Sequence, residues 1–217
     1  MRMAENVIYV LAAYLIGSVP FGYLAGRLNG IDLREHGSCN IGATNTVRVL
    51  GKKWGIPVFI LDFLKGFGPL LYMRCHLGGE VTQFDACRMG WLLAVLFALV
   101  LGHTFTCFLK FRGGKGVATT AGCLVALSPI IGLWTVLTWI GCMVLTRYVS
   151  LSSMMAGVAM MVAAAWVFWW QDGSCSVSDM MVLGLLMLVF VLVVVKHRSN
   201  IVRLCSGTEP KAFSSKK

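Results

Sequence analysis

The sequence predicts an all-α membrane protein with about seven transmembrane helices, and two observations lead to this prediction. Of the 217 residues, 58% are hydrophobic and only 13% are charged, whereas a soluble domain has about 45–50% apolar and about 25% charged residues. The apolar residues also lie in long runs, and a membrane-spanning helix needs roughly 20 of them. We therefore expect one integral membrane domain over residues 1–217.

Six apolar runs supply the predicted spans, and one is long enough to be divided. The run 117–146 contains Pro129, which lacks a backbone donor and disfavours helix at the preceding residue. We expect two short spans there, about 117–128 and 131–146, which brings the total to seven. The first run is too long for the apolar part of a signal peptide, so we interpret it as a retained span. The runs are about 7–26, 54–73, 89–109, 117–146, 151–170 and 180–195.

The basic residues predict the orientation of these spans. When the loops alternate between the two sides, 15 of the 19 Lys and Arg residues fall on one side. Cytoplasmic loops of membrane proteins carry such an excess, so we expect the N-terminus outside, the C-terminus inside and a site built from interfacial cytoplasmic loops. Topology then explains the net charge of +10, and we expect no nucleic-acid partner.

The eight cysteines include no C-x-x-C pair. A structural zinc site needs clustered ligands, so we expect no metal. Within the second apolar run, Asp62 and Lys65 are three residues apart and are predicted to pair. Ionisable residues inside a membrane are candidates for function, but a structural ion pair explains these two equally well.

The first polar segment, 30–48, combines small residues, hydroxyls, amides and two arginines. Small residues let backbone N–H groups approach an anion, and a following helix N-terminus favours negative charge. Arg48 can bind two phosphate oxygens at once. A hydrated connector would also be rich in turn formers, but the density of donors favours a binding function. The side-chain donors are Ser38, Asn40, Thr44 and Asn45.

The second polar segment, 102–120, places three glycines around Lys115 immediately before a predicted helix. That arrangement suits a phosphate-binding loop with a lysine as a point charge. It is not a Walker A loop, because Gly116 occupies the position of the Ser or Thr. The alternative is a basic hinge that obeys the positive-inside rule. We interpret His103 as a residue that caps or orients this segment. The glycines are Gly113, Gly114 and Gly116.

The third polar segment, 196–211, begins where the last span reaches the interface. His197 and Asn200 are three residues apart, so on a helix they share a face. Histidine can act as a base near neutral pH. The alternative is a basic tail that binds anionic lipid.

Together these segments resemble the acyl-phosphate:glycerol-3-phosphate acyltransferases, the PlsY family of bacterial inner-membrane enzymes. Their order and spacing fit over nearly the whole chain. The family's first motif usually reads GSGN, and here Cys39 replaces the second glycine, which would strain a position that needs a positive φ. The matching stretches are GSVPFGYLAGRLNGIDLREHGSCNIGATNTVRVLG, GHTFTCFLKFRGGKGVAT and KHRSNIVRLCSGTEPK, with RYVSLSS between the last two.

The resemblance implies an enzyme of phospholipid biosynthesis without a cofactor. It would transfer a fatty acyl group from acyl phosphate to the 1-position hydroxyl of glycerol 3-phosphate, giving lysophosphatidate and phosphate. Its partners would be these substrates and membrane lipid, and its site would face the cytoplasm at the bacterial inner membrane. The resemblance also implies catalytic roles for Ser38, His197 and Asn200, substrate binding by Asn40, Thr44, Asn45, Arg48, Gly113, Gly114, Lys115 and Gly116, and a structural role for Glu209.

Two other observations bear on this function. Soluble-type glycerolipid acyltransferases, which use thioesters, resemble one another in an H-x4-D motif, and none of the four histidines here has an aspartate at that spacing. A transporter of a phosphorylated or anionic metabolite is the main alternative, and a lipid-binding scaffold is a second. Transporters place their binding groups near the midplane, on broken helices within repeats, whereas here the polar groups gather in an interfacial layer without a visible repeat.

Overall fold

The computed structural model describes residues 3–170 and 176–212, and every regular element in them is helical. The all-α prediction is therefore confirmed. The chain divides into two compact units, unit 1 (Met1–Leu127) and unit 2 (Ser128–Lys217). The boundary falls inside the long apolar run, where α6 (Val117–Leu127) ends and α7 (Pro129–Thr146) begins. Pro129 occupies the first turn of α7, where a missing N–H costs no helical hydrogen bond.

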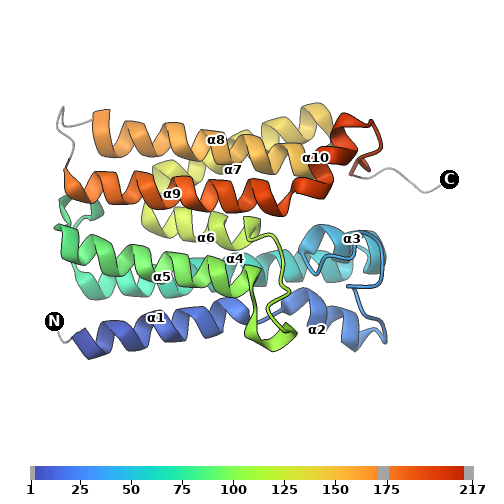
Figure 1. Cartoon of the computed structure of the whole chain (residues 1–217), viewed down its shortest axis with the longest axis horizontal. Helices are drawn as coiled ribbons and strands as arrows, with labels where there is room; N and C mark the ends of the chain where they lie inside the picture. Colours follow the sequence, from blue (N-terminus) through green and yellow to red (C-terminus); the bar gives the residue numbers. More distant parts are fainter. Residues whose placement is uncertain (1–2, 171–175, 213–217) are drawn as a thin grey trace. The chain divides into compact units, whose positions relative to one another are not determined.

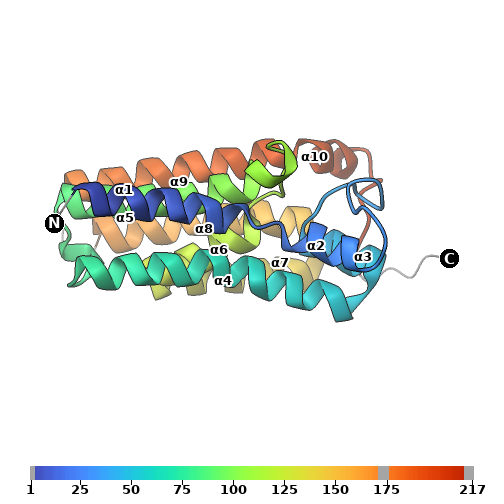
Figure 2. The ribbon, with the colours of Figure 1, turned by 90° about the horizontal axis from the view of Figure 1, so that it is seen from below.

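In unit 1 the long helices α1, α4 and α5 lie side by side, and α6 packs on α4 (Figures 1 and 2). The short helices α2 and α3 lie at the end of the unit where α4 begins. The polar segments of unit 1 are therefore attached to a bundle of apolar helices. Besides α6, unit 1 contains α1 (Met3–Ser18), α2 (Phe21–Leu28), α3 (Ala43–Leu50), α4 (Lys52–Leu77), α5 (Ala86–Thr104) and the 3-10 turns η1 (Val81–Gln83) and η2 (Cys107–Leu109).

In unit 2, α8 packs against both α7 and α9. The short helix α10 follows α9 after a single intervening residue, His197. Besides α7, the unit contains α8 (Val149–Ala165), the π-helical turn η3 (Trp166–Trp170), α9 (Val177–Lys196) and α10 (Arg198–Cys205).

Six helical segments in the described residues are long and apolar enough to cross a membrane. The seventh predicted span corresponds to α6, which has 11 residues. At about 1.5 Å per residue such a helix covers roughly half of a hydrocarbon core of about 30 Å. The exact number of crossings stays a prediction. The six segments are Met3–Leu28, Lys52–Leu77, Ala86–Leu109, Pro129–Thr146, Val149–Phe168 and Val177–Lys196.

The first span is interrupted at Val19 and Pro20, between α1 and α2. The break leaves backbone carbonyls that need partners, because the interior of a membrane protein offers little water. The hydroxyl of Thr106 donates to the carbonyl of Ser18 at 2.6 Å, and the Nζ atom of Lys65 donates to the carbonyl of Val19 at 2.8 Å. Side chains from other segments of unit 1 therefore stabilise the break.

Glycines bring α4 and α6 into close contact. A Cβ atom added at Gly66 would lie 2.2 Å from the carbonyl oxygen of Thr119, and one at Gly122 would lie 2.1 Å from that of Phe63. Small residues at such crossings let membrane helices approach closely. The start of α6, which forms the end of the second polar segment, is thereby fixed on α4.

The orientation can be tested at the two ends of α4, on a chain whose native cysteines have been replaced. Lys53→Cys, beside the first polar segment, should react with an impermeant maleimide only from the cytoplasmic side, because that end carries the excess of basic residues. Gln83→Cys, beyond the far end of α4, should react only from outside. Labelling of intact and permeabilised spheroplasts measures both, and reaction of Lys53→Cys from outside would reverse the predicted orientation.

Candidate active site

One buried amide holds the first polar segment together. Asn45, in the first turn of α3, is 1% exposed. Its Oδ1 atom accepts from the N–H of Ser38 at 2.8 Å. Its Nδ2 atom donates to the carbonyls of Leu33, His36 and Asn40 at 3.3, 2.9 and 2.8 Å. Asparagine suits this role because its amide both donates and accepts. These contacts favour a loop-positioning role for Asn45 over the predicted direct contact with substrate.

The other predicted residues of this segment are more accessible than Asn45. Ser38, Thr44 and Arg48 are exposed, and Asn40 is half-buried. Thr44 and Arg48 are four residues apart on α3, so they share a face. The Oδ1 atom of Asn40 accepts from the N–H of Gly42 at 2.8 Å, which shapes the turn before α3. The segment therefore presents two hydroxyls and a guanidinium close together in the sequence and open to a ligand.

Cys39 lies at the tip of this loop with a φ of 56°. This is the left-handed region, which glycine adopts readily and other residues adopt at a cost. The structure thus explains why the related motif carries glycine at this position.

The second polar segment folds back on the end of α5. The N–H of Gly113 donates to the carbonyl of Thr104 at 3.2 Å, and that of Gly114 donates to the carbonyl of His103 at 3.0 Å. The N–H groups of these two glycines, which were predicted to form a phosphate cradle, are therefore already hydrogen-bonded within the protein. Gly116 has a φ of 82° and directly precedes α6, so it makes the turn into that helix.

The space around both positions nevertheless favours glycine. A Cβ atom at Gly113 would lie 2.0 Å from the carbonyl oxygen of His103, and one at Gly114 would lie 2.1 Å from its Nε2 atom. The two glycines allow the loop to lie against α5, which fixes the residues on either side, Arg112 and Lys115.

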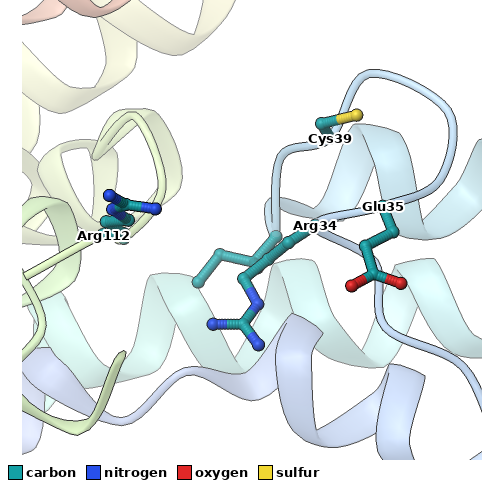
Figure 3. A pocket seen from close by; sticks show the side chains of 6 residues that line it. Arg34, Glu35, Cys39 and Arg112 are labelled. Atoms are coloured by element: carbon teal, nitrogen blue, oxygen red, sulfur yellow. The ribbon is translucent and has the colours of Figure 1, made fainter. Parts of the chain in front are cut away.

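The first and second polar segments line a common pocket of about 350 Å³ (Figure 3). Arg112 approaches it from one side, and Arg34, Glu35 and Cys39 from the other. A further pocket of about 510 Å³ shares both arginines and is otherwise partly aromatic. The first pocket is also lined by Ile41 and Gly113, and the second by Tyr23, Phe108, Leu109 and Lys110.

Arg34 is held in place by its neighbours. Its Nε atom donates to both carboxylate oxygens of Asp32, at 3.0 and 3.1 Å, and its guanidinium lies 4.9 Å from the centre of the Tyr23 ring. The hydrogen bond from Arg34 lowers the pKa of the Asp32 carboxyl to about 2, so the pair stays charged near neutral pH. Arg34 and Arg112 do not stand out in the sequence as site residues, because basic residues in these loops are also explained by topology.

The third polar segment lies in unit 2. His197 is 3% exposed and separates α9 from α10. Its Nδ1 atom lies 2.8 Å from the carbonyl of Val193. A carbonyl can only accept, so Nδ1 carries the hydrogen, and in the neutral ring Nε2 is the atom that accepts a proton.

Glu209, in the tail that follows α10, is hydrogen-bonded to α8 and α10 of unit 2. Its carboxylate accepts hydrogen bonds from Ser150 at 2.7 Å, from the Nδ2 atom of Asn200 at 2.6 Å and from the Nε atom of Arg203 at 2.7 Å. Burial raises the pKa of Glu209, but these hydrogen bonds outweigh burial and lower it overall. The amide of Asn200, predicted as catalytic, thus also fastens the tail that follows α10.

A metal site is not found in the described residues, where no group of three His, Cys, Asp or Glu side chains could hold an ion.

Comparison with known proteins identifies the family. The family model described as glycerol-3-phosphate acyltransferase matches residues 7–207. The chain belongs to the glycerol-3-phosphate acyltransferase family. A glycerol-3-phosphate acyltransferase of Aquifex aeolicus (strain VF5) is 41% identical over 201 residues, which cover 92% of this chain and 95% of the relative. One of Staphylococcus haemolyticus (strain JCSC1435) is 38% identical over 209 residues, covering 94% and 96%.

Solved structures of the integral membrane glycerol 3-phosphate acyltransferase PlsY (YgiH) share the fold. Its glycerol 3-phosphate form is 39% identical with a TM-score of 0.83, and its lysophosphatidic acid form is 38% identical with a TM-score of 0.80. Each alignment covers 95% of both chains. The resemblance to the PlsY family is confirmed, and this glycerol-3-phosphate acyltransferase family member is an integral membrane acyltransferase. The transporter alternative is not retained.

Cys39→Gly should stabilise this acyltransferase by about 0.5–1 kcal/mol, because relief of a left-handed residue, about 1–2 kcal/mol, exceeds the entropic cost of glycine, about 0.5–1 kcal/mol. Thermal unfolding in detergent measures the change. The matched control is Cys75→Gly, an exposed cysteine within α4, which should lower stability because glycine disfavours helix. A lower melting temperature for Cys39→Gly would contradict the strain argument.

Proposed function

We propose that this protein transfers a fatty acyl group from acyl phosphate to the 1-position hydroxyl of glycerol 3-phosphate, giving lysophosphatidate and inorganic phosphate. The observation that carries the proposal is the pocket between the first two polar segments, to which Arg34 and Arg112 contribute guanidinium groups. One guanidinium group can donate two parallel hydrogen bonds to two oxygens of a phosphate group. The glycerol 3-phosphate and lysophosphatidic acid forms of PlsY support the acceptor and the product.

The residues suit a reaction that proceeds by positioning and charge stabilisation. The hydroxyl oxygen of glycerol 3-phosphate attacks the carbonyl carbon of acyl phosphate, an ester C–O bond forms, and the C–O bond to phosphate breaks with its electron pair leaving on phosphate. The hydroxyl proton passes to a base or to the departing phosphate. Because an acyl phosphate is already activated, no covalent enzyme nucleophile is required, and orientation with electrostatic stabilisation can supply the rate.

We assign the residues of unit 1 accordingly. Ser38 would hydrogen-bond the reacting groups, and Asn40 and Thr44 would bind substrate oxygens. Arg48 and Lys115 would bind phosphate, while Gly113, Gly114 and Gly116 shape the loop that carries Lys115. Asn45 would hold the first loop in shape. For unit 2 we propose that His197 and Asn200 act on the attacking hydroxyl group. We propose that Glu209 is structural, because its carboxylate accepts hydrogen bonds from Ser150, Asn200 and Arg203.

We further propose that the reaction takes place at the cytoplasmic face of the bacterial inner membrane. The polar segments 102–120 and 196–211 are rich in basic residues, which favours that side, and the lipid product can enter the bilayer directly. The labelling of Lys53→Cys tests this orientation.

The donor is tested with purified protein, glycerol 3-phosphate and either palmitoyl phosphate or palmitoyl-CoA. Lysophosphatidate should form with palmitoyl phosphate and not with the thioester, because the phosphate-binding groups are present and the H-x4-D pattern of thioester users is absent. Mass spectrometry of the lipid product measures this. Efficient turnover with the thioester and none with palmitoyl phosphate would contradict the proposed donor.

A pair of arginine variants connects that activity to the pocket. Arg112→Gln should raise the KM for a phosphate-bearing substrate about tenfold or more, because a hydrogen bond to a charged group contributes about 1.5–3 kcal/mol. Arg88→Gln, an exposed arginine near the start of α5, should leave turnover unchanged. If the two substitutions changed the KM equally, the pocket would not be part of the substrate-binding site.

The role of His197 is tested by two amides of different length. If His197 is a general base, both His197→Gln and His197→Asn should lose about 100- to 10,000-fold in rate, since an amide side chain cannot accept the hydroxyl proton at neutral pH. If it orients the hydroxyl through Nε2, His197→Gln should keep substantial activity, because its amide reaches that position, and His197→Asn should not. We expect the second pattern. His76→Asn, at the last turn of α4, is the control and should behave as the parent protein.

A further inference from the structure

Three ionisable side chains of unit 1 are buried together, and the proposed reaction uses none of them. Asp62 is 2% exposed, and Lys65 and His103 are each 6% exposed. The Nζ atom of Lys65 lies 2.7 Å from Oδ1 of Asp62, which confirms the predicted pair. The Nδ1 atom of His103 lies 3.5 Å from the same oxygen. Buried ionisable groups are costly in a membrane, so their arrangement calls for a role.

Each member of this cluster also contacts a segment other than its own helix. Lys65 donates to the carbonyl of Val19 at the break between α1 and α2. The backbone carbonyl of Asp62 accepts from the hydroxyl of Thr119 in α6 at 3.0 Å. The cluster thus joins α4 and α5 to the helix break and to the helix that follows the glycine loop.

His103 contacts the glycine loop through two different parts of its structure. Its backbone carbonyl accepts from the N–H of Gly114. Its ring lies against the Cα atom of the same glycine, since a Cβ atom there would be 2.1 Å from Nε2 and 3.0 Å from both Cδ2 and Cε1. The ring therefore limits how closely the loop can approach α5, and its opposite nitrogen, Nδ1, lies beside the Asp62 carboxylate.

We infer that His103, oriented by the Asp62–Lys65 pair, is a positioning residue that sets the place of the loop 112–116 and hence of Arg112 and Lys115. It acts through Gly114 and does not touch substrate. The functional consequence rests on the proposed acyl transfer, whereas the contact between the ring and Gly114 can be tested separately.

The test is a double-substitution experiment with an internal control. Gly114→Ala should lower kcat/KM by about 100-fold, the loss expected for a displacement of about 1 Å. His103→Asn shortens the side chain and keeps a donor for Asp62, so Gly114→Ala with His103→Asn should recover about tenfold of that loss. At Gly113 the colliding atoms belong to the backbone of His103 and Thr104, so His103→Asn should not rescue Gly113→Ala.

A second measurement separates positioning from general stability. His103→Asn should raise the KM for the phosphate-bearing substrates while kcat changes less, in protein whose melting temperature stays near that of the parent. Rescue of Gly114→Ala alone, together with this KM effect, supports the inference. Rescue of neither glycine variant, equal rescue of both, or a lowered melting temperature with an unchanged KM would overturn it.

The failure of the proposed function would be visible separately. If the parent protein shows no acyl transfer, the proposed function is wrong, and the melting temperatures of the two glycine variants are compared with and without His103→Asn. Under the inference, His103→Asn restores the melting temperature of Gly114→Ala and not that of Gly113→Ala. Any other pattern of melting temperatures would contradict the inferred role of the contact between the His103 ring and Gly114, independently of the activity.

Discussion

The structure of unit 1 depends on one constraint, that a backbone broken inside an apolar bundle must still have its polar groups bonded. The chain breaks between α1 and α2 and again after α5. Lys65 and Thr106 bond the carbonyls of the first break, and the hydroxyl of Tyr14 donates to the carbonyl of Phe105 at 2.7 Å, after the end of α5. Each break is thus bonded by side chains from elsewhere in the unit, so the polar segments that follow them begin from fixed points.

This constraint explains why the candidate site combines rigid loops with exposed cations. Asn45 uses its amide to hold the first loop, and Gly113 and Gly114 use their N–H groups to attach the second loop to α5. Groups occupied in this way cannot also bind a ligand, so binding falls to longer side chains such as Arg112 and Arg48. The guanidinium group lies at the end of a flexible arginine side chain, so it can reach a phosphate group while the backbone stays fixed.

The sequence predicted the helices well, because length and hydropathy decide which segments cross a bilayer. It also located the division at Pro129. It did not predict the break at Pro20, the helix α3 inside the first polar segment or the pocket lined by Arg34 and Arg112. A donor such as Asn45 looks the same in a sequence whether it faces a ligand or its own backbone. That difference depends on which carbonyls the folded loop brings within reach, and composition does not encode it.

Cys39 and Gly114 show how little freedom such a loop has. The φ of 56° at Cys39 and the ring beneath Gly114 are both local features that a substitution would disturb without touching substrate. Yet the catalysis proposed here depends on placement more than on reactive groups, because acyl phosphate is activated before it arrives. Backbone positions that only shape the loops are therefore as important to the rate as the side chains that bind phosphate. In an enzyme with a covalent nucleophile, by contrast, one reactive atom would carry a larger share of the rate.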